Sequence, residues 1–357
     1  LMNIKRAKQE IKNTIRAYQL KNADGTYRIP SIRQRPVLLM GPPGVGKTQI
    51  MEQIAEECDL PLVSYTITHH TRQSAIGLPF IQQKEYGGKT YSVTEYTMSE
   101  IIASVYDRME ETGKQEGILF IDEINCVSET LAPTMLQFLQ CKTFGNQKVP
   151  AGWVIVAAGN PPEYNKSVRE FDIVTLDRVK KISVEADFPV WKEFAYEQKI
   201  HGAIISYLEI RQENFCRIET TVDGKRFVTP RGWQDLSEML YVYEELGIAI
   251  DQEVVGQYLQ NARVAKDFAS YLDLYAKYRT DYQVDGILKG IWKPSAIEKL
   301  RYAQFDERLS VIGLLISRLG EIFSEVQTLD EQVTARYEEL KRKKAEEGEL
   351  DEQIRAA

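Results

Sequence analysis

The sequence is poor in cysteine and histidine and has no long apolar run. Its 357 residues include 4 cysteines and 3 histidines, with no C-x-x-C pair and no histidine at matching spacing. A zinc site is therefore not expected, and isolated cysteines are typical of a reducing cytoplasm. No apolar run approaches the roughly 20 residues of a membrane-spanning helix, so no membrane association is expected. The segment Leu1–Arg6 lacks the apolar core of a signal peptide.

The chain also lacks an excess of positive charge. It carries 45 Lys and Arg against 52 Asp and Glu, a formal net charge of −7. Proteins that bind nucleic acid without specificity are more often basic, so nucleic acid is not an expected partner, although a local basic pore stays open as an alternative. The length allows one large or two modest domains, and the 43% hydrophobic and 27% charged content is typical of a soluble globular protein.

One stretch organises the rest of the chain. Residues 41–48 fit the phosphate-loop pattern G-x-x-x-x-G-K-[ST], preceded by the apolar run Val37–Met40 and followed by helical spacing of apolar residues. Glycines let the backbone approach a phosphate, and the amides at the helix N-terminus face the anion. Lys47 would reach the β- and γ-phosphates, and the Thr48 hydroxyl would ligate Mg²⁺. The predicted nucleotide-binding residues are Gly41, Pro42, Pro43, Gly44, Val45, Gly46, Lys47, Thr48 and Gln49.

A second motif, Ile118–Glu123, is an apolar run that ends in two carboxylates. The pattern predicts a strand buried on both faces, with the acids at its carboxyl end, where ligands bind in open parallel sheets. Asp122 would hold Mg²⁺, and Glu123 would orient and deprotonate the attacking water. An apolar run ending in Asp-Glu is common by itself, and it becomes specific because it follows the phosphate loop.

Three further polar residues are candidates of a weaker kind. Asn160 lies just after the apolar run 153–158 and could polarise the attacking water. Alone, it is better explained as a turn residue ahead of proline. Arg178 precedes a predicted edge strand and could reach the nucleotide of a neighbouring subunit. Arg231 lies near a helix start and could fold back onto the γ-phosphate, although a surface arginine is the better explanation in isolation.

The chain divides into four segments by pattern. Residues 1–28 predict an N-terminal helix and linker, and residues 29–188 predict an α/β core with an insert near 69–98. Within these, Gly87-Gly88 and Gly145-Asn146 suit hairpin turns. Residues 189–325 predict an α-helical region, and residues 326–357 a charged helical tail that is either solvated or a short coiled coil. The helices expected in the third segment include 190–199, 201–211, 232–246 and 251–278.

Taken together, these motifs resemble an AAA+ ATPase, and more narrowly its MoxR-type branch. Gly41–Thr48 is similar to the Walker A motif, Ile118–Glu123 to Walker B and Asn160 to sensor 1. Asp177-Arg178 and Thr229–Arg231 lie where this family has its arginine finger and its sensor 2. The insert 69–98 resembles the helix-2 insert of this branch, and 141–150 its pre-sensor-1 hairpin. The resemblance covers about residues 30–300, while 163–172 does not match closely.

The resemblance implies a fold, an activity and an assembly. The fold would be α/β, a five-stranded parallel P-loop sheet with helices on both faces, followed by an α-helical lid. The activity would be Mg²⁺-dependent ATP hydrolysis, in which ATP rather than GTP is implied by the family alone. The arginine finger, acting in trans, would require a homo-oligomeric ring, as in the family's hexamers. Members of this branch are maturation chaperones, often with partners that carry a von Willebrand factor A domain.

Two alternatives come from other functional classes. A nucleotide-gated scaffold with slow turnover is disfavoured by Glu123 and Arg178, which a pure scaffold need not keep. A DNA-acting motor, such as a GTP-driven restriction subunit, is disfavoured by the net negative charge of the chain and by the sequence Gly159-Asn160-Pro161.

Overall fold

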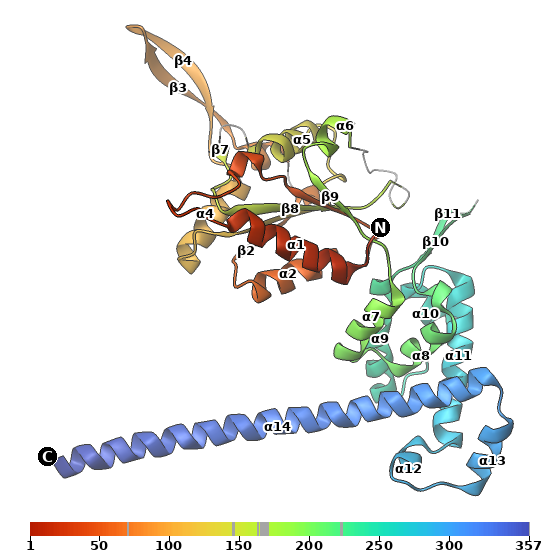
Figure 1. Cartoon of the computed structure of the whole chain (residues 1–357). Helices are drawn as coiled ribbons and strands as arrows, with labels where there is room; N and C mark the ends of the chain where they lie inside the picture. The colour runs from red at the N-terminus through yellow and green to blue at the C-terminus, as the bar shows by residue number, and fades with distance from the viewer. Residues whose placement is uncertain (70, 145–146, 163, 165–170, 222–223, 357) are drawn as a thin grey trace. The chain divides into compact units, whose positions relative to one another are not determined.

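The computed structural model describes residues 1–69, 71–144, 147–162, 164, 171–221 and 224–356 (Figure 1). The chain folds as two units. The first comprises Leu1–Trp191 together with Thr229–Arg231, and the second comprises Lys192–Val228 together with Gly232–Ala357. Among the described residues, no helix is both long and apolar enough to cross a lipid bilayer.

A five-stranded parallel sheet forms the centre of the first unit. Its strands lie in the order β2-β5-β8-β1-β9, so that β9 and β2 are the two edges. The five-stranded parallel sheet that the resemblance implies is confirmed, and the lysines of β9 lie at an edge, where charged residues discourage pairing with another strand. The strands are β1 (Val37–Met40), β2 (Leu62–Thr66), β5 (Gly117–Asp122), β8 (Trp153–Gly159) and β9 (Lys180–Ser183).

Helices cover both faces of this sheet, as the resemblance to AAA+ ATPases implies. Side chains alternate along β8, so Val156 contributes to one apolar cluster and Ile155 to the other. The Val156 cluster includes residues of α1 (Ile4–Gln19) and α2 (Lys47–Glu57), and the Ile155 cluster includes residues of α4 (Glu100–Thr112) and α5 (Ala132–Cys141). The shorter helices of this unit are η1 (Ser31–Arg33), η2 (Ile67–His69), α3 (Arg72–Ile76) and α6 (Ile173–Leu176).

The register of the sheet aligns the carboxyl ends of its strands, so that they lie together at one end of the sheet. Thr66 of β2 pairs with Asp122 of β5, and Met40 of β1 pairs with Gly159 of β8. The loops that follow these four strands therefore begin side by side. These are the loops that carry the phosphate-binding pattern, the paired carboxylates and Asn160.

The insert contains a long β-hairpin. Strands β3 (Pro79–Tyr86) and β4 (Lys89–Tyr96) pair antiparallel and project from the first unit (Figure 1). The predicted turn at Gly87-Gly88 is confirmed, because both residues adopt positive φ values of 60° and 77° and glycine tolerates this conformation. The predicted turn at Gly145-Asn146 lies outside the described residues. Its flanking strands, β6 (Thr143–Phe144) and β7 (Gln147–Lys148), do pair antiparallel.

The second unit is mainly helical and is built around aromatic side chains. The rings of Tyr207, Trp233 and Phe268 lie 5.2–5.7 Å apart, centroid to centroid. These residues belong to α8 (Gly202–Ile210), α9 (Pro230–Leu246) and α11 (Ala262–Asp281), while α7 (Phe188–Glu197) spans the boundary between the two units. The remaining helices are η3 (Gln212–Asn214), α10 (Gln252–Tyr258), α12 (Val284–Leu288), α13 (Pro294–Tyr302) and α14 (Phe305–Ala356).

Two predictions for this region are wrong in detail. The single helix expected over 251–278 is two helices, α10 and α11, because the backbone is extended at Leu259 and the Asn261 side chain caps α11 by accepting the Val264 N–H. The region is also not purely helical. Strands β10 (Arg217–Thr221) and β11 (Gly224–Val228) form an antiparallel hairpin that the helical prediction misses.

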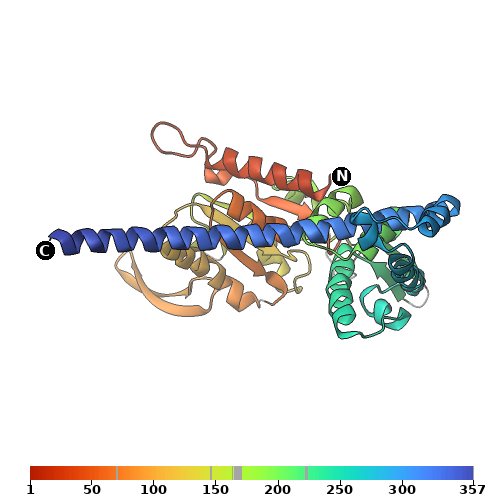
Figure 2. The same ribbon diagram turned by 90° about the horizontal axis from the view of Figure 1, so that it is seen from below.

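The last helix, α14, has 52 residues and is straight in both views (Figures 1 and 2). It continues without a break through residue 326, where the change in composition suggests the start of a separate tail. The final segment is therefore helical, as predicted, and belongs to the same helix as the residues before it.

Candidate active site

The phosphate loop connects β1 to α2. Gly46 caps α2 with a φ of 88°, in the left-handed region that glycine favours, and it has no side chain with which to cap the helix. The first amides of α2 are therefore not occupied by a capping side chain and can bind an anion. A Cβ built on Gly46 would approach nothing closer than Gln49 Oε1 at 3.8 Å, so the loop is open at this position.

Lys47 is buried inside the loop. Its Nζ donates hydrogen bonds to the carbonyl oxygens of Gly41 at 2.9 Å and Pro42 at 2.7 Å, and to Asn160 Oδ1 at 2.7 Å. The pKa of Lys47 is lowered to about 8, mainly by burial, with the charge of Asp122 opposing this shift and the charge of Arg231 adding to it. The ammonium group thus has polar neighbours but an incompletely compensated charge, which a phosphate would stabilise.

Thr48 and Asp122 are in contact at the carboxyl end of the sheet. The Thr48 hydroxyl donates a hydrogen bond to Asp122 Oδ2 at 2.7 Å. A hydroxyl and a carboxylate in contact are the hard oxygen donors that Mg²⁺ accepts alongside water and phosphate oxygens. These two predicted metal ligands therefore fit the ion by the chemistry of their donors.

Glu123 is held in an unusual backbone conformation. Its φ is 56°, a left-handed value that costs a residue with a side chain about 1–3 kcal/mol. Its N–H donates to Asp122 Oδ1 at 2.8 Å, and its Oε2 accepts a hydrogen bond from the Thr68 hydroxyl at 2.9 Å. The turn directs the Glu123 side chain differently from a continuing strand, and Thr68 fixes one of its carboxylate oxygens.

The sequence analysis misses Thr68. This residue follows β2, which neighbours β5 in the sheet. Polar residues that follow adjacent parallel strands lie close together at the carboxyl end of the sheet. That signal was available only once the strand order was known.

Asn125 is a second residue that the sequence analysis misses. It is almost fully buried, and its Nδ2 donates to the Asn160 carbonyl oxygen at 2.8 Å. A Cβ on Gly159 would lie 2.4 Å from Asn125 Oδ1, so the small residue at the end of β8 makes room for this contact. Asn125 therefore positions the backbone that carries Asn160, whose side chain contacts Lys47.

Of the two predicted arginines, one lies at the loop and one does not. Arg231 groups with the first unit, and a Cβ on Gly44 would lie 3.1 Å from Arg231 Cβ. Arg178 is exposed between α6 and β9, and its Nη1 donates to Gln140 Oε1 of α5 at 2.7 Å. The structure thus brings together Lys47, Thr48, Asp122, Glu123, Asn160 and Arg231, and it leaves Arg178 with a partner outside this group.

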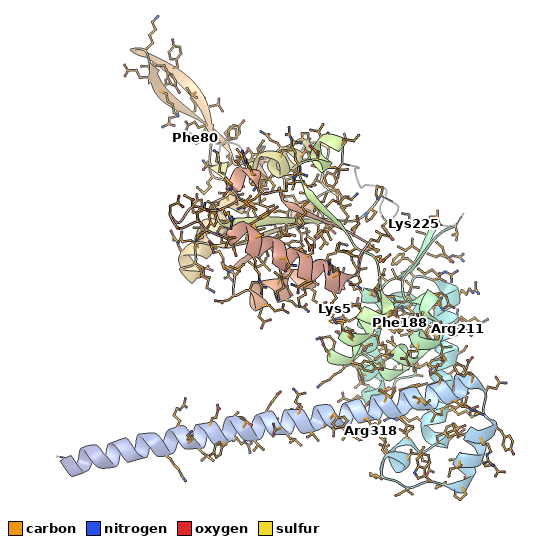
Figure 3. The ribbon with its side chains drawn as sticks, viewed as in Figure 1. Lys5, Phe80, Phe188, Arg211, Lys225 and Arg318 are labelled. Carbon is orange, nitrogen blue, oxygen red and sulfur yellow. The ribbon has the colours of Figure 1, made fainter. Side chains whose placement is uncertain are left out.

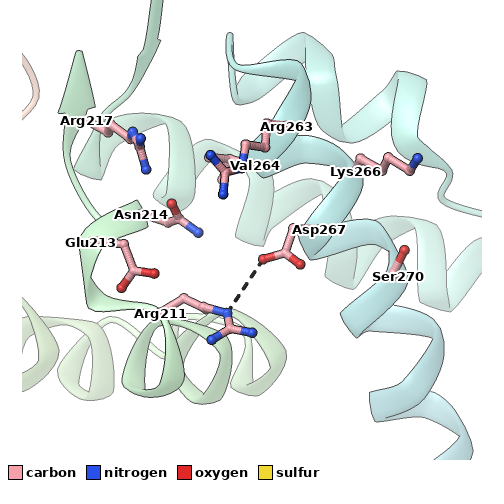
Figure 4. A pocket seen from close by; sticks show the side chains of 9 residues that line it. All are labelled: Arg211, Glu213, Asn214, Arg217, Arg263, Val264, Lys266, Asp267 and Ser270. Carbon is pink, nitrogen blue, oxygen red and sulfur yellow. Dashed lines mark ion pairs between the residues drawn. The ribbon is translucent and has the colours of Figure 1, made fainter. Parts of the chain in front are cut away.

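A separate hollow of about 570 Å³ lies within the second unit, between the η3 segment and α11 (Figure 4). It is lined by more cations than carboxylates, and Arg211 Nε lies 3.9 Å from Asp267 Oδ2. Its charged side chains are largely exposed, and none of the predicted site residues lines it.

Comparison with known proteins identifies the segment that carries the phosphate loop. Residues 37–176 match the family model described as "ATPase family associated with various cellular activities (AAA)". The matched segment contains the phosphate loop, both carboxylates and Asn160, and it ends just before Arg178. The match supports an ATPase activity in general and a nucleotide as its ligand.

Solved structures similar to the chain include two mutants of RuvB from Thermotoga maritima. Both are 17% identical in sequence, with TM-scores of 0.32 and 0.33, and they match 55% and 57% of this chain. The matches cover 51% and 52% of the RuvB chains, so this chain spans about half their length. Similarity at this level says nothing about what the chain acts on. Comparison with curated proteins gives no match.

Proposed function

We propose that the chain is a Mg²⁺-dependent ATPase of the MoxR type that assembles into a ring and remodels or matures a client protein in the cytoplasm. The observation that carries this proposal is that Glu123, the Thr48–Asp122 pair and the buried Lys47 lie together at the carboxyl end of the sheet. The match of residues 37–176 to the AAA family model supports the ATPase class, and the motifs 41–48 and 118–123 support hydrolysis rather than binding alone.

Each residue has a distinct part in this proposal. Lys47 and the α2 amides bind the phosphates, and Thr48 and Asp122 would hold Mg²⁺, which would neutralise negative charge on the phosphate oxygens. Glu123 accepts the proton of the attacking water, and its fixed backbone limits where its carboxylate can lie. Asn160 uses Oδ1 to accept from Lys47, which leaves its Nδ2 to orient that water. Arg231 contacts the γ-phosphate as sensor 2.

Arg178 is the reason to propose a ring. It is exposed, and its hydrogen bond goes to Gln140 rather than to the phosphate loop of its own chain. An arginine supplied by a neighbouring subunit stabilises the charge of the transition state and can raise the rate by several orders of magnitude. We propose that Arg178 serves the nucleotide of the next subunit, in a ring that is a hexamer by analogy with the family.

Remodelling of a client requires that the nucleotide state reaches other parts of the chain. Helix α9 begins with Pro230 and Arg231, which belong to the first unit, and continues into the second unit. A change at the γ-phosphate that moves Arg231 is thereby transmitted along one continuous helix. A client protein or a von Willebrand factor A domain partner, as in the MoxR branch, would receive this motion.

The test is ATP turnover and ATP binding by the wild type and by Glu123→Gln. The variant should bind ATP with unchanged affinity and lose at least about 100-fold in turnover, because it removes the general base alone. The matched control is Glu129→Gln, the same change at an exposed position of the same loop, which should leave turnover intact. A wild-type protein that binds ATP but never hydrolyses it, alone or with client, would favour a nucleotide-gated scaffold instead.

A further inference from the structure

Helix α14 carries a heptad repeat of apolar residues. With Ile312 at position d, the spacing alternates between four and three residues along the helix, which is the pattern of a coiled-coil seam. The d positions are Ile312, Leu319, Val326, Val333 and Leu340. The a positions are Ile316, Phe323, Asp330, Tyr337 and Lys344.

The residues of α14 that pack against their own unit lie off this seam, because Ile312, Ile316 and Leu319 are 51%, 43% and 40% exposed. Val311 and Leu314 are buried, and Arg318 Nε lies 2.8 Å from Asp285 Oδ1 of α12 (Figure 3). From Phe323 to Lys344, each side chain that the structure describes is exposed. The exposed fractions are 57% for Val326, 65% for Val333, 67% for Tyr337 and 61% for Leu340. We call Phe323–Lys344 the free seam.

A helix with an unpartnered apolar seam is poorly suited to water. An exposed helix that binds nothing needs polar residues all round, whereas five of the seven a and d positions of the free seam, which face a partner in a coiled coil, are apolar or aromatic. An exposed apolar stripe of this kind, interrupted at Asp330, marks an interaction surface.

The charges beside the free seam indicate which partner fits. In this stretch the flanking e and g positions include Arg336, Lys341 and Lys343 and no acidic residue. Lys343 makes an exposed ion pair with Glu339 at 2.7 Å, which is too weak to prevent it from pairing across an interface. The flanks therefore present positive charge, and they complement a helix with acidic flanks.

A second copy of the chain fits less well. Parallel, in-register pairing would place Asp330 against Asp330, Lys344 against Lys344 and Arg336 against Lys341, and like charges at these positions repel. Antiparallel pairing would bring the two Asp330 carboxylates close together between the Val333 side chains. Either arrangement of two copies places like charges in or beside the apolar seam.

We propose that the free seam docks a helix of a different protein, one with apolar residues at its own a and d positions and Glu or Asp at its e and g positions. The free seam is part of the second unit and shares no residue with the phosphate loop. The proposal therefore does not depend on ATP hydrolysis.

The test uses the full chain and two labelled, designed four-heptad peptides. Both peptides have Leu and Ile at a and d and one Lys at a central a position, and they differ only in having Glu or Lys at every e and g position. Fluorescence anisotropy should show that the Glu peptide binds at least about tenfold more tightly at low salt, with the difference shrinking as salt screens the charges.

Variants separate the seam from the rest of the helix. Val333→Asp should abolish binding of the Glu peptide, and the matched change Ala335→Asp, at the outward-facing f position, should leave it intact. Replacing Arg336, Lys341 and Lys343 together by Glu should reverse the preference between the peptides. Circular dichroism and ATP turnover check that each variant is folded.

Three results would overturn the proposal. Binding of neither peptide would show that the seam does not dock a helix, and equal binding of both would show that the flanking charges do not select the partner. Self-association of the wild type in sedimentation velocity that Val333→Asp removes would instead assign the seam to a second copy of the chain.

Discussion

Nucleotide binding at pH 8 should take up about half a proton through Lys47. Burial lowers the pKa of Lys47 to about 8, so roughly half of the nucleotide-free molecules carry a neutral amine at that pH. Phosphate oxygens beside Nζ favour the charged form, so Lys47 is protonated in the complex. Because the nucleotide's phosphates are already ionised at pH 8, the proton must come from the buffer.

The assay is calorimetric titration of the chain with ADP in buffers that differ in ionisation enthalpy. The dependence of the observed heat on that enthalpy gives the number of protons taken up, which should be about 0.5 at pH 8 and about 0.1 at pH 7. Lys47→Arg keeps a cation that cannot titrate, so uptake should vanish. Lys142, whose pKa burial also lowers to about 8, bonds to the Ser31 carbonyl instead, and Lys142→Arg should change nothing.

The same pKa shift affects stability with a defined sign. In the unfolded chain Lys47 has its ordinary pKa of 10.5, so between pH 8 and 10.5 the unfolded state binds more protons than the folded state. The Lys47 contribution therefore makes the nucleotide-free fold more stable as pH rises through this window. Proton release on binding, no uptake at pH 8, or uptake that survives Lys47→Arg would refute this account of the loop.

Two other substitutions test the site and the core. Thr68→Val removes the hydrogen bond to Glu123, and the loss of about 1 kcal/mol should lower the ATP turnover number about fivefold with ATP affinity unchanged. Thr68→Ser should retain activity. A rise in turnover in Thr68→Val would contradict a positioning role. Gly117→Ala should destabilise the fold by about 1–3 kcal/mol in denaturant unfolding, because its Cβ would lie 2.7 Å from the Trp153 ring. The control Gly320→Ala lies in a helix with nothing within 4 Å and should stabilise by up to about 1 kcal/mol, and equal effects of both changes would contradict the packing argument.

Much of the first unit could be predicted from the sequence because its signals are local. Continuous apolar runs mark the central strands, and the phosphate loop fixes where β1 ends and α2 begins. The carboxylates at the end of β5 and Asn160 after β8 could be placed together because the carboxyl ends of parallel strands lie at the same end of the sheet. The helices on both faces of the sheet, which the resemblance to AAA+ ATPases implies, are also confirmed.

What could not be predicted depends on neighbours in space. Thr68 acts through the adjacency of β2 and β5, and Asn125 acts through the close approach of Gly159, and neither is visible in a linear pattern. The break between α10 and α11 is set by the Asn261 cap, which interrupts an otherwise helical pattern. The contribution of Arg178 depends on a second subunit and remains a prediction.

The central claim is that one active site is shared by two subunits, and mixing two inactive variants tests it most directly. ATP turnover would be measured against protein concentration for the wild type, Glu123→Gln, Arg178→Ala and a mixture of the two variants. The account predicts that wild-type turnover per subunit rises with concentration, that each variant is inactive and that the mixture regains part of the activity, because each variant supplies the residue that the other lacks. Fully active Arg178→Ala, with turnover per subunit independent of concentration, would contradict it.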